Sequence, residues 1–289
     1  MRTPDDALTG LPDYPFEQQY REVDGLRLAH IDEGEGAPVI FMHGEPTWSF
    51  LWRKVIPPVR DAGFRCVAPD LAGFGGSDKP TDVGWYSFDR HCEMTATLLE
   101  DLDLRGATVV VHDWGGGIGL NMAVEHAERI ERMVILDTGL FTGRQKMSDA
   151  WLAFHDFVVR TEDLPVGMLV RRACKTDPGD EVTAAYEAPY PGPASKAGAR
   201  AFPLMMPRTP EDPGAARGQR TQEALEADHR PKLVLWADSD PIIPLKAGER
   251  LAEKFNAPPP RTIEDASHFL QEDQGPLIGS LISDWLTAG

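Results

Sequence analysis

The pattern of apolar and polar positions is clearest between residues 107 and 126. Residues 107–111 are an unbroken run of small and β-branched side chains, typical of a central strand buried on both faces of a parallel sheet. The run ends at Asp113, and residues 115–117 are all glycine before apolar residues return at helical spacing from Ile118. We therefore expect Asp113 at a sharp strand-to-helix turn, which the small residues beside it permit.

The same alternation of strand and helix patterns continues along much of the chain. Further strands are predicted at residues 26–31, 38–42, 65–68, 132–137, 232–236 and 261–263. The first of these alternates apolar and polar positions, which predicts an edge strand of an antiparallel pair. Alternating strands and helices with buried β-branched runs predict an α/β domain with a mainly parallel sheet covered on both faces.

The helical patterns are equally regular. One helix is expected after Trp48, with Phe50, Leu51, Val55, Ile56 and Val59 on its apolar side. Ser87 is expected to cap a second helix that runs to Leu102, and the last helix has apolar residues at 277, 278, 281, 282 and 285. The glycines at 73, 75 and 76 predict a tight turn, because the Lys-Ser/Thr ending of a phosphate-binding loop is absent.

The alternation stops beyond about Gly143. Residues 144 to about 215 contain helical patterns and a proline-rich stretch but no convincing strand. We interpret this segment as an inserted, mostly helical cap over the sheet. The predicted organisation is a core made of residues 1–143 and 216–289, with a cap formed by residues 144–215.

Polar side chains stand at the predicted ends of several parallel strands. These residues are Glu45, Asp113, Asp137, Asp240 and His268. Ligand and catalytic sites in such sheets lie beyond the carboxyl ends of the strands. The five side chains are therefore expected to converge at one rim of the sheet.

The turn at Asp113 has two interpretations, a helix N-cap and a nucleophile elbow. A cap explains the aspartate but not the glycines around it. As a nucleophile, Asp113 would form a covalent ester, whose hydrolysis needs a base and a group that orients the base. His268 is the candidate base and Asp240 the candidate orienting acid, with Asp137 and Asp238 as weaker competitors for that acid.

Composition narrows the possible functions. The 289 residues carry a formal net charge of −17, which argues against binding to nucleic acid or to an anionic membrane. The three cysteines are widely spaced, which fits reduced thiols in the cytoplasm and gives no metal-binding signature. The sequence has no secretory leader pattern and no apolar run of about 18 residues.

Four segments together resemble the haloalkane dehalogenases. They are residues 43–48 (HGEPTW), 73–80 (GFGGSDKP), 112–116 (HDWGG) and the late His268. The resemblance covers nearly the whole chain and is strongest to the subfamily whose catalytic acid follows the strand after the cap. It implies an α/β-hydrolase fold with an eight-stranded, mainly parallel sheet. It also implies hydrolysis of a small halogenated alkane by water, with release of halide and without cofactor or metal.

The resemblance assigns a role to each candidate residue. Asp113 would be the nucleophile, His268 the general base and Asp240 the acid that orients it. Backbone N–H groups of Glu45 and Trp114 would form the oxyanion hole.

The departing halide needs donors that are not themselves nucleophiles, and an indole N–H meets that requirement. Trp114 is the first candidate, and the subfamily takes its second donor from a cap tryptophan. Trp151 is the only tryptophan of the cap. Phe154, about one helical turn away, cannot donate. The protein is expected to be a monomer or a small homo-oligomer.

Two other functions fit part of the pattern. An epoxide hydrolase also uses an aspartate nucleophile but needs cap tyrosines, and Tyr186 and Tyr190 flank what is predicted to be a loop. A non-catalytic binding protein of the same fold is the second alternative. The apolar residues Phe154, Phe157, Phe202 and Leu204 fit either a substrate cavity or core packing.

Overall fold

The computed structural model describes residues 1–4 and 6–288. Its centre is an eight-stranded sheet with the order β1-β2-β4-β3-β5-β6-β7-β8. The strands are β1 (Gln19–Val23), β2 (Leu26–Glu33), β3 (Pro38–Met42), β4 (Arg65–Pro69), β5 (Ala107–His112), β6 (Ile130–Leu136), β7 (Lys232–Ala237) and β8 (Arg261–Ile263). Strands β1 and β2 are antiparallel to their neighbours and all other pairs are parallel. The predicted α/β-hydrolase fold is confirmed.

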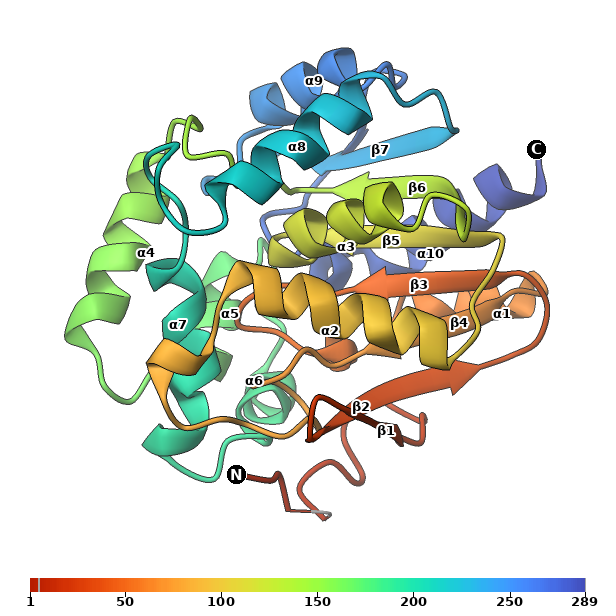
Figure 1. Cartoon of the computed structure of the whole chain (residues 1–289). Coiled ribbons are helices and arrows are strands. Elements are labelled where there is room, and N and C mark those ends of the chain that lie inside the picture. The colour runs from red at the N-terminus through yellow and green to blue at the C-terminus, as the bar shows by residue number, and fades with distance from the viewer. Residues whose placement is uncertain (5, 289) are drawn as a thin grey trace.

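Helices cover both faces of this sheet (Figure 1). In that view α2 (Phe88–Asp101), α3 (Trp114–Glu125) and α8 (Ala215–Glu226) lie in front of the sheet, while α1 (Ile56–Asp61) and α10 (Leu270–Thr287) lie behind it. Helix α9 (Leu245–Lys254) packs beside β7. Every residue of β5 is buried, as the β-branched pattern predicts for a strand covered on both sides.

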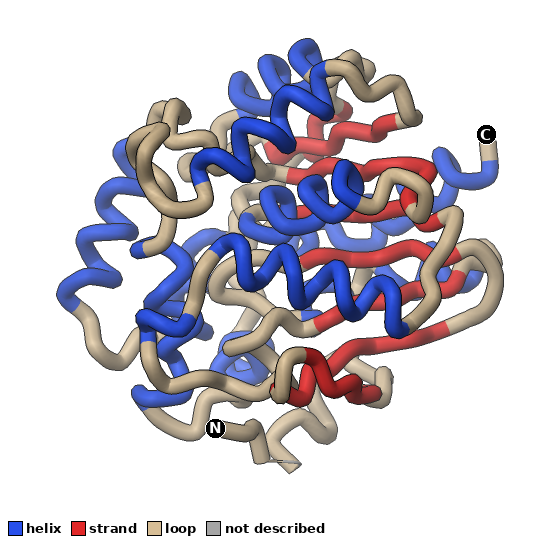
Figure 2. Tube along the Cα trace, in the orientation of Figure 1, coloured by secondary structure: helices blue, strands red, loops and turns tan. Residues whose placement is uncertain are grey.

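Four helices gather beyond one end of the sheet (Figures 1 and 2). They are α4 (Asp149–Arg160), α5 (Val166–Ala173), α6 (Asp180–Glu187) and α7 (Ala197–Leu204), here called the cap helices. All four fall within the segment that lacks strand patterns, and α8, which packs on α3, follows them. The exact division at residues 143 and 215 stays a prediction.

Two local predictions were wrong. Strand β2 is not an edge strand, because β1 pairs with its outer side. Four of the five residues of β1 are exposed, so this strand has no pattern of apolar residues that would predict it. The single helix predicted after Trp48 is split into a 3-10 helix at Ser49–Trp52 and α1. Two prolines stand in the first turn of α1, where their missing N–H groups are tolerated.

Candidate active site

Asp113 lies at a sharp turn between β5 and α3. Its backbone angles are φ 50° and ψ −127°, a conformation that non-glycine residues adopt only where the surrounding structure holds them. Neighbouring glycines allow the close approach: a Cβ on Gly44 would lie 2.1 Å from Asp113 Oδ1, and one on Gly115 would lie 2.2 Å from the Met42 carbonyl oxygen. The nucleophile-elbow geometry, rather than a simple N-cap, is therefore what the chain adopts, since no side-chain cap bond forms.

The two oxygens of the Asp113 carboxylate have different surroundings. Oδ1 accepts a hydrogen bond of 2.8 Å from the backbone N–H of Glu45. Oδ2 lies 3.6 Å from His268 Nε2, and the side chain keeps 15% of its surface exposed. Burial raises the pKa of Asp113, but His268 and the backbone N–H of Trp114 lower it, and the pKa ends below its ordinary value. The group is therefore an accessible carboxylate anion.

His268 connects this carboxylate to a second one. Its Nδ1 lies 2.8 Å from Asp240 Oδ2, and only 3% of the imidazole surface is exposed. Asp240 Oδ1 in turn accepts backbone N–H bonds from Ile242 at 2.6 Å and Ile243 at 3.0 Å. Nδ1 faces Asp240, so Nε2, which faces Asp113, is the ring nitrogen that can gain or lose a proton. Burial lowers the pKa of His268, but Asp240 and Asp113 together raise it well above its ordinary value.

The other strand-end acids have different partners. Asp137 accepts the backbone N–H of Ala237 at 3.1 Å. Burial and the neighbouring Asp240 raise the pKa of Asp137 well above its ordinary value, which favours the protonated form. Asp238 accepts backbone N–H bonds from Asp265 and Ala266 in the loop before His268. Of the three acids, Asp240 is the one that lies at hydrogen-bond distance from the imidazole.

Glu45 contributes to the site through both its backbone and its side chain. Its carboxyl is buried, and Oε1 has no hydrogen-bond partner among the described residues. Burial and the nearby Asp113 anion raise the pKa of this carboxyl well above its ordinary value. Both effects favour the protonated form of Glu45 beside Asp113.

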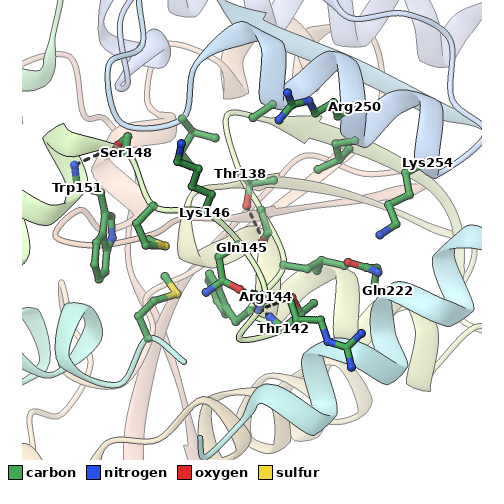
Figure 3. A pocket seen from close by; sticks show the side chains of 18 of the residues that line it. Thr138, Thr142, Arg144, Gln145, Lys146, Ser148, Trp151, Gln222, Arg250 and Lys254 are labelled. Atoms are coloured by element: carbon green, nitrogen blue, oxygen red, sulfur yellow. Dashed lines mark hydrogen bonds between the residues drawn. The ribbon is translucent and has the colours of Figure 1, made fainter. Parts of the chain in front are cut away.

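Both candidate halide donors are buried: Trp114 directly follows Asp113 in the chain, and Trp151 lines the same cleft as Asp113. Trp114 packs against Phe141 at a ring distance of 4.0 Å and against Phe202 at 5.0 Å. Trp151, on α4, lines a cleft of about 530 Å³ whose wall also includes Asp113 and Phe141. Figure 3 shows the Trp151 indole on one side of this cleft. In the described part of the chain neither indole N–H has a hydrogen-bond acceptor, which leaves both free for a ligand.

The remaining cap residues are distributed differently from what the sequence suggested. Phe157 and Leu204 are 38% and 42% exposed, and neither is among the residues that line the cleft at Asp113. Phe202 is buried against Trp114. Tyr186 lies in α6 and not in a loop, and its hydroxyl donates to Glu272. Tyr190 does lie outside the helices, with its ring buried.

Two further residues, His112 and Thr138, support the elbow and the imidazole. His112, the last residue of β5, places its Nε2 2.8 Å from the carbonyl oxygen of His268 and so ties the base to the central strand. The hydroxyl of Thr138 donates to the carbonyl oxygen of Asp113. His112 could be noticed because it precedes the nucleophile, whereas nothing local distinguishes Thr138.

Comparison with known proteins agrees with this geometry. Residues 37–274 match the model of the α/β-hydrolase fold family. A haloalkane dehalogenase of Mycolicibacterium paratuberculosis is 38% identical, over 100% of this chain and 98% of its own length. One of Mycobacterium marinum is 39% identical, over 99% of each. The chain belongs to the haloalkane dehalogenase family.

Solved structures of the family superpose closely. The tetrameric haloalkane dehalogenase DpaA of Paraglaciecola agarilytica has a TM-score of 0.90 and 33% identity, over 97% of this chain and 96% of that one. Within residues 1–4 and 6–288, no group of three His, Cys, Asp or Glu side chains is placed to hold a metal ion. Nor does any helix there combine the length and apolar character needed to cross a membrane.

Proposed function

We propose that this dehalogenase converts haloalkanes to an alcohol, a halide ion and a proton through a covalent ester on Asp113. The observation that carries the proposal is the arrangement at the elbow. One oxygen of Asp113 is held by a backbone N–H of Glu45, and the other faces the His268–Asp240 pair. A carboxylate in this setting suits nucleophilic attack followed by hydrolysis.

In the first step Asp113 Oδ2 attacks the carbon that carries the halogen. A C–O bond forms, and the electron pair of the carbon–halogen bond leaves with the halide. Trp114 and Trp151 donate their indole N–H groups to the departing anion, which requires no proton. Oδ1 stays against the Glu45 N–H and becomes the carbonyl oxygen of the ester.

In the second step His268 removes a proton from water, which attacks the Cγ atom of Asp113. Negative charge develops on Oδ1, where the N–H groups of Glu45 and Trp114 stabilise it. The bond between Cγ and Oδ2 then breaks, and the alcohol leaves with Oδ2 and the proton from His268. The water oxygen stays on Asp113, whose new carboxyl group releases the remaining proton. Esterification removes the Asp113 anion, one of the groups that raise the pKa of His268. The pKa of His268 therefore falls when the ester forms, which prepares the imidazole to act as a base.

The direct test is bromide release from 1-bromobutane, with styrene oxide in a parallel assay. Asp113→Ala is expected to reduce bromide release by roughly 10⁵-fold or more, because nucleophile and reaction path are both lost. Asp101→Asn, an exposed aspartate on α2, is the matched control and should keep full activity. Turnover of styrene oxide alone would instead favour an epoxide hydrolase.

A further inference from the structure

The cleft that reaches Asp113 is larger than a short haloalkane requires. Its volume of about 530 Å³ lies within the usual range for drug-sized ligands. It extends from Asp113 past the segment 138–148 to α8 and α9 (Figure 3). The wall near the nucleophile includes the apolar side chains of Leu140, Phe141 and Ile242. A substrate could therefore carry a further group beyond the reacting carbon.

The outer part of the cleft is positively charged. Four cations line it, namely Arg144, Lys146, Arg250 and Lys254, against one acidic residue, Glu223. All four are exposed, whereas Asp113 is mostly covered. This is unusual for a chain with 46 acidic and 29 basic residues.

Most of these charges are not neutralised by neighbours. Lys254 pairs with Glu226 at 3.2 Å, on the rim of the cleft. Arg144, Lys146 and Arg250 form no ion pair with any residue that the structure describes. They come from two segments about a hundred positions apart in the sequence, and Figure 3 shows them around the same cleft.

We infer that this cleft selects haloalkanes that carry an anionic group at the far end of the carbon chain, the simplest being ω-halo carboxylates. The inference rests on the proposed function, since the halogenated carbon must reach Asp113. A cleft lined by one sign of charge focuses the field and concentrates ligands of the opposite sign. Because the protein as a whole carries a net charge of −17, anions are repelled elsewhere and are attracted to the cations of the cleft.

The position of the cations distinguishes this substrate class from short haloacids. A carboxylate next to the reacting carbon would lie beside the Asp113 anion, and like charges at such short distance repel each other. A carboxylate several methylenes away would reach the exposed cations while the apolar wall contacts the chain. The chemical step is unchanged: Asp113 displaces halide, water hydrolyses the ester, and a hydroxycarboxylate is released.

Binding of the product tests the inference without relying on turnover. Ligand-observed NMR titrations of the intact protein would compare 6-hydroxyhexanoate with 1-hexanol at low salt. We expect the anion to bind roughly tenfold more tightly, and the advantage to shrink as ionic strength rises. Equal dissociation constants for the two ligands would overturn the inference.

Substitutions of the cleft cations test whether these side chains cause the preference for the anion. The triple variant Arg144→Gln, Lys146→Gln, Arg250→Gln should remove the advantage of the anion and leave 1-hexanol binding unchanged. Lys246→Gln is the matched control, because Lys246 is an exposed cation of the same helix α9 that does not line the cleft. If Lys246→Gln removed as much affinity for the anion as the triple variant, the preference would come from overall charge and not from the cations of the cleft.

Turnover then separates this inference from the proposed function. Bromide release from 6-bromohexanoate should exceed that from 1-bromohexane roughly tenfold in kcat/KM at low salt. Release from 1-bromohexane without that preference would overturn the inference and leave the dehalogenase function intact. If bromide were released from neither compound, the proposed function would be overturned. The product titrations would still show whether the cleft prefers anionic ligands.

Discussion

The sheet core and the cap helices hold their functional side chains in different ways. Asp113 and Asp240 follow the ends of strands, and backbone N–H groups fix their carboxylates. Trp151 stands on α4, which reaches the core through the Ser148 hydroxyl, 2.8 Å from the carbonyl oxygen of Ile242. Ser148 also caps α4 by accepting the N–H of Trp151.

This difference suggests that the strand ends carry out the chemical steps and that the cap helices contribute to ligand binding. Backbone donors hold a carboxylate in one position at little entropic cost, which bond-forming steps need. A helix attached mainly by side chains can shift slightly and accept different ligands. Substitutions at the strand ends should therefore change the chemical steps by orders of magnitude, and substitutions in the cap should change binding or stability by smaller factors.

The largest effect is expected at the base. His268→Phe leaves Asp113 and the indoles in place but removes the group that activates water. One equivalent of bromide should be released, and the alkyl ester should then remain on Asp113. Mass spectrometry of the peptide that contains Asp113 would detect the added alkyl group. An unmodified peptide after incubation with 1-bromobutane would contradict the assigned roles.

The next largest loss of activity is expected at Asp240, and a second buried aspartate, Asp137, provides the comparison. Asp240→Asn removes the charge that orients His268, and bromide release should fall by roughly 10⁴-fold. Asp137→Asn should cost less than about tenfold, because Asp137 acts as an acceptor for the Ala237 N–H and an amide oxygen can replace it. Steady-state kinetics of both variants would measure this. Similar losses in the two would mean that both acids serve the imidazole.

Trp151→Phe tests the cap itself. The variant keeps the aromatic wall of the cleft but loses the indole donor. Since a hydrogen bond to a charged group contributes about 1.5–3 kcal/mol, kcat/KM should fall by roughly 10–100-fold. The inhibition constant of bromide should rise in parallel. Trp285→Phe, on the distant helix α10, is the control and should change neither value.

The strand-end rim could be predicted because its signals are local. A β-branched run, an aspartate and three glycines specify the elbow within a dozen residues of Asp113. The position of His268 follows from the rule that parallel strands end at one edge. Asp240 was preferred over Asp137 on strand-end geometry alone, and the structure shows a physical reason: Asp137 accepts the N–H of Ala237.

What could not be predicted depends on contacts between distant segments. The cationic opening joins residues 144–146 to α9, and no local pattern links them. The hydroxyl of Tyr186 donates a hydrogen bond to Glu272, which lies 86 residues later in the chain. No local sequence pattern predicts this contact. Strand β1 was missed because its exposed residues carry no apolar alternation, so only its pairing with β2 defines it.

The smallest effect concerns how the cap is attached, and two cap tyrosines provide the comparison. The Tyr186 hydroxyl donates to Glu272, which also binds Arg53 at the core. Tyr186→Phe should lower the free energy of unfolding by about 1.5–3 kcal/mol, since a bond to a charged group is lost. The buried Tyr190 hydroxyl has no partner among the described residues, so Tyr190→Phe should be neutral or slightly stabilising. Urea denaturation of both variants measures the difference. Equal destabilisation would mean that ring packing, and not the bond to Glu272, holds the cap on the core.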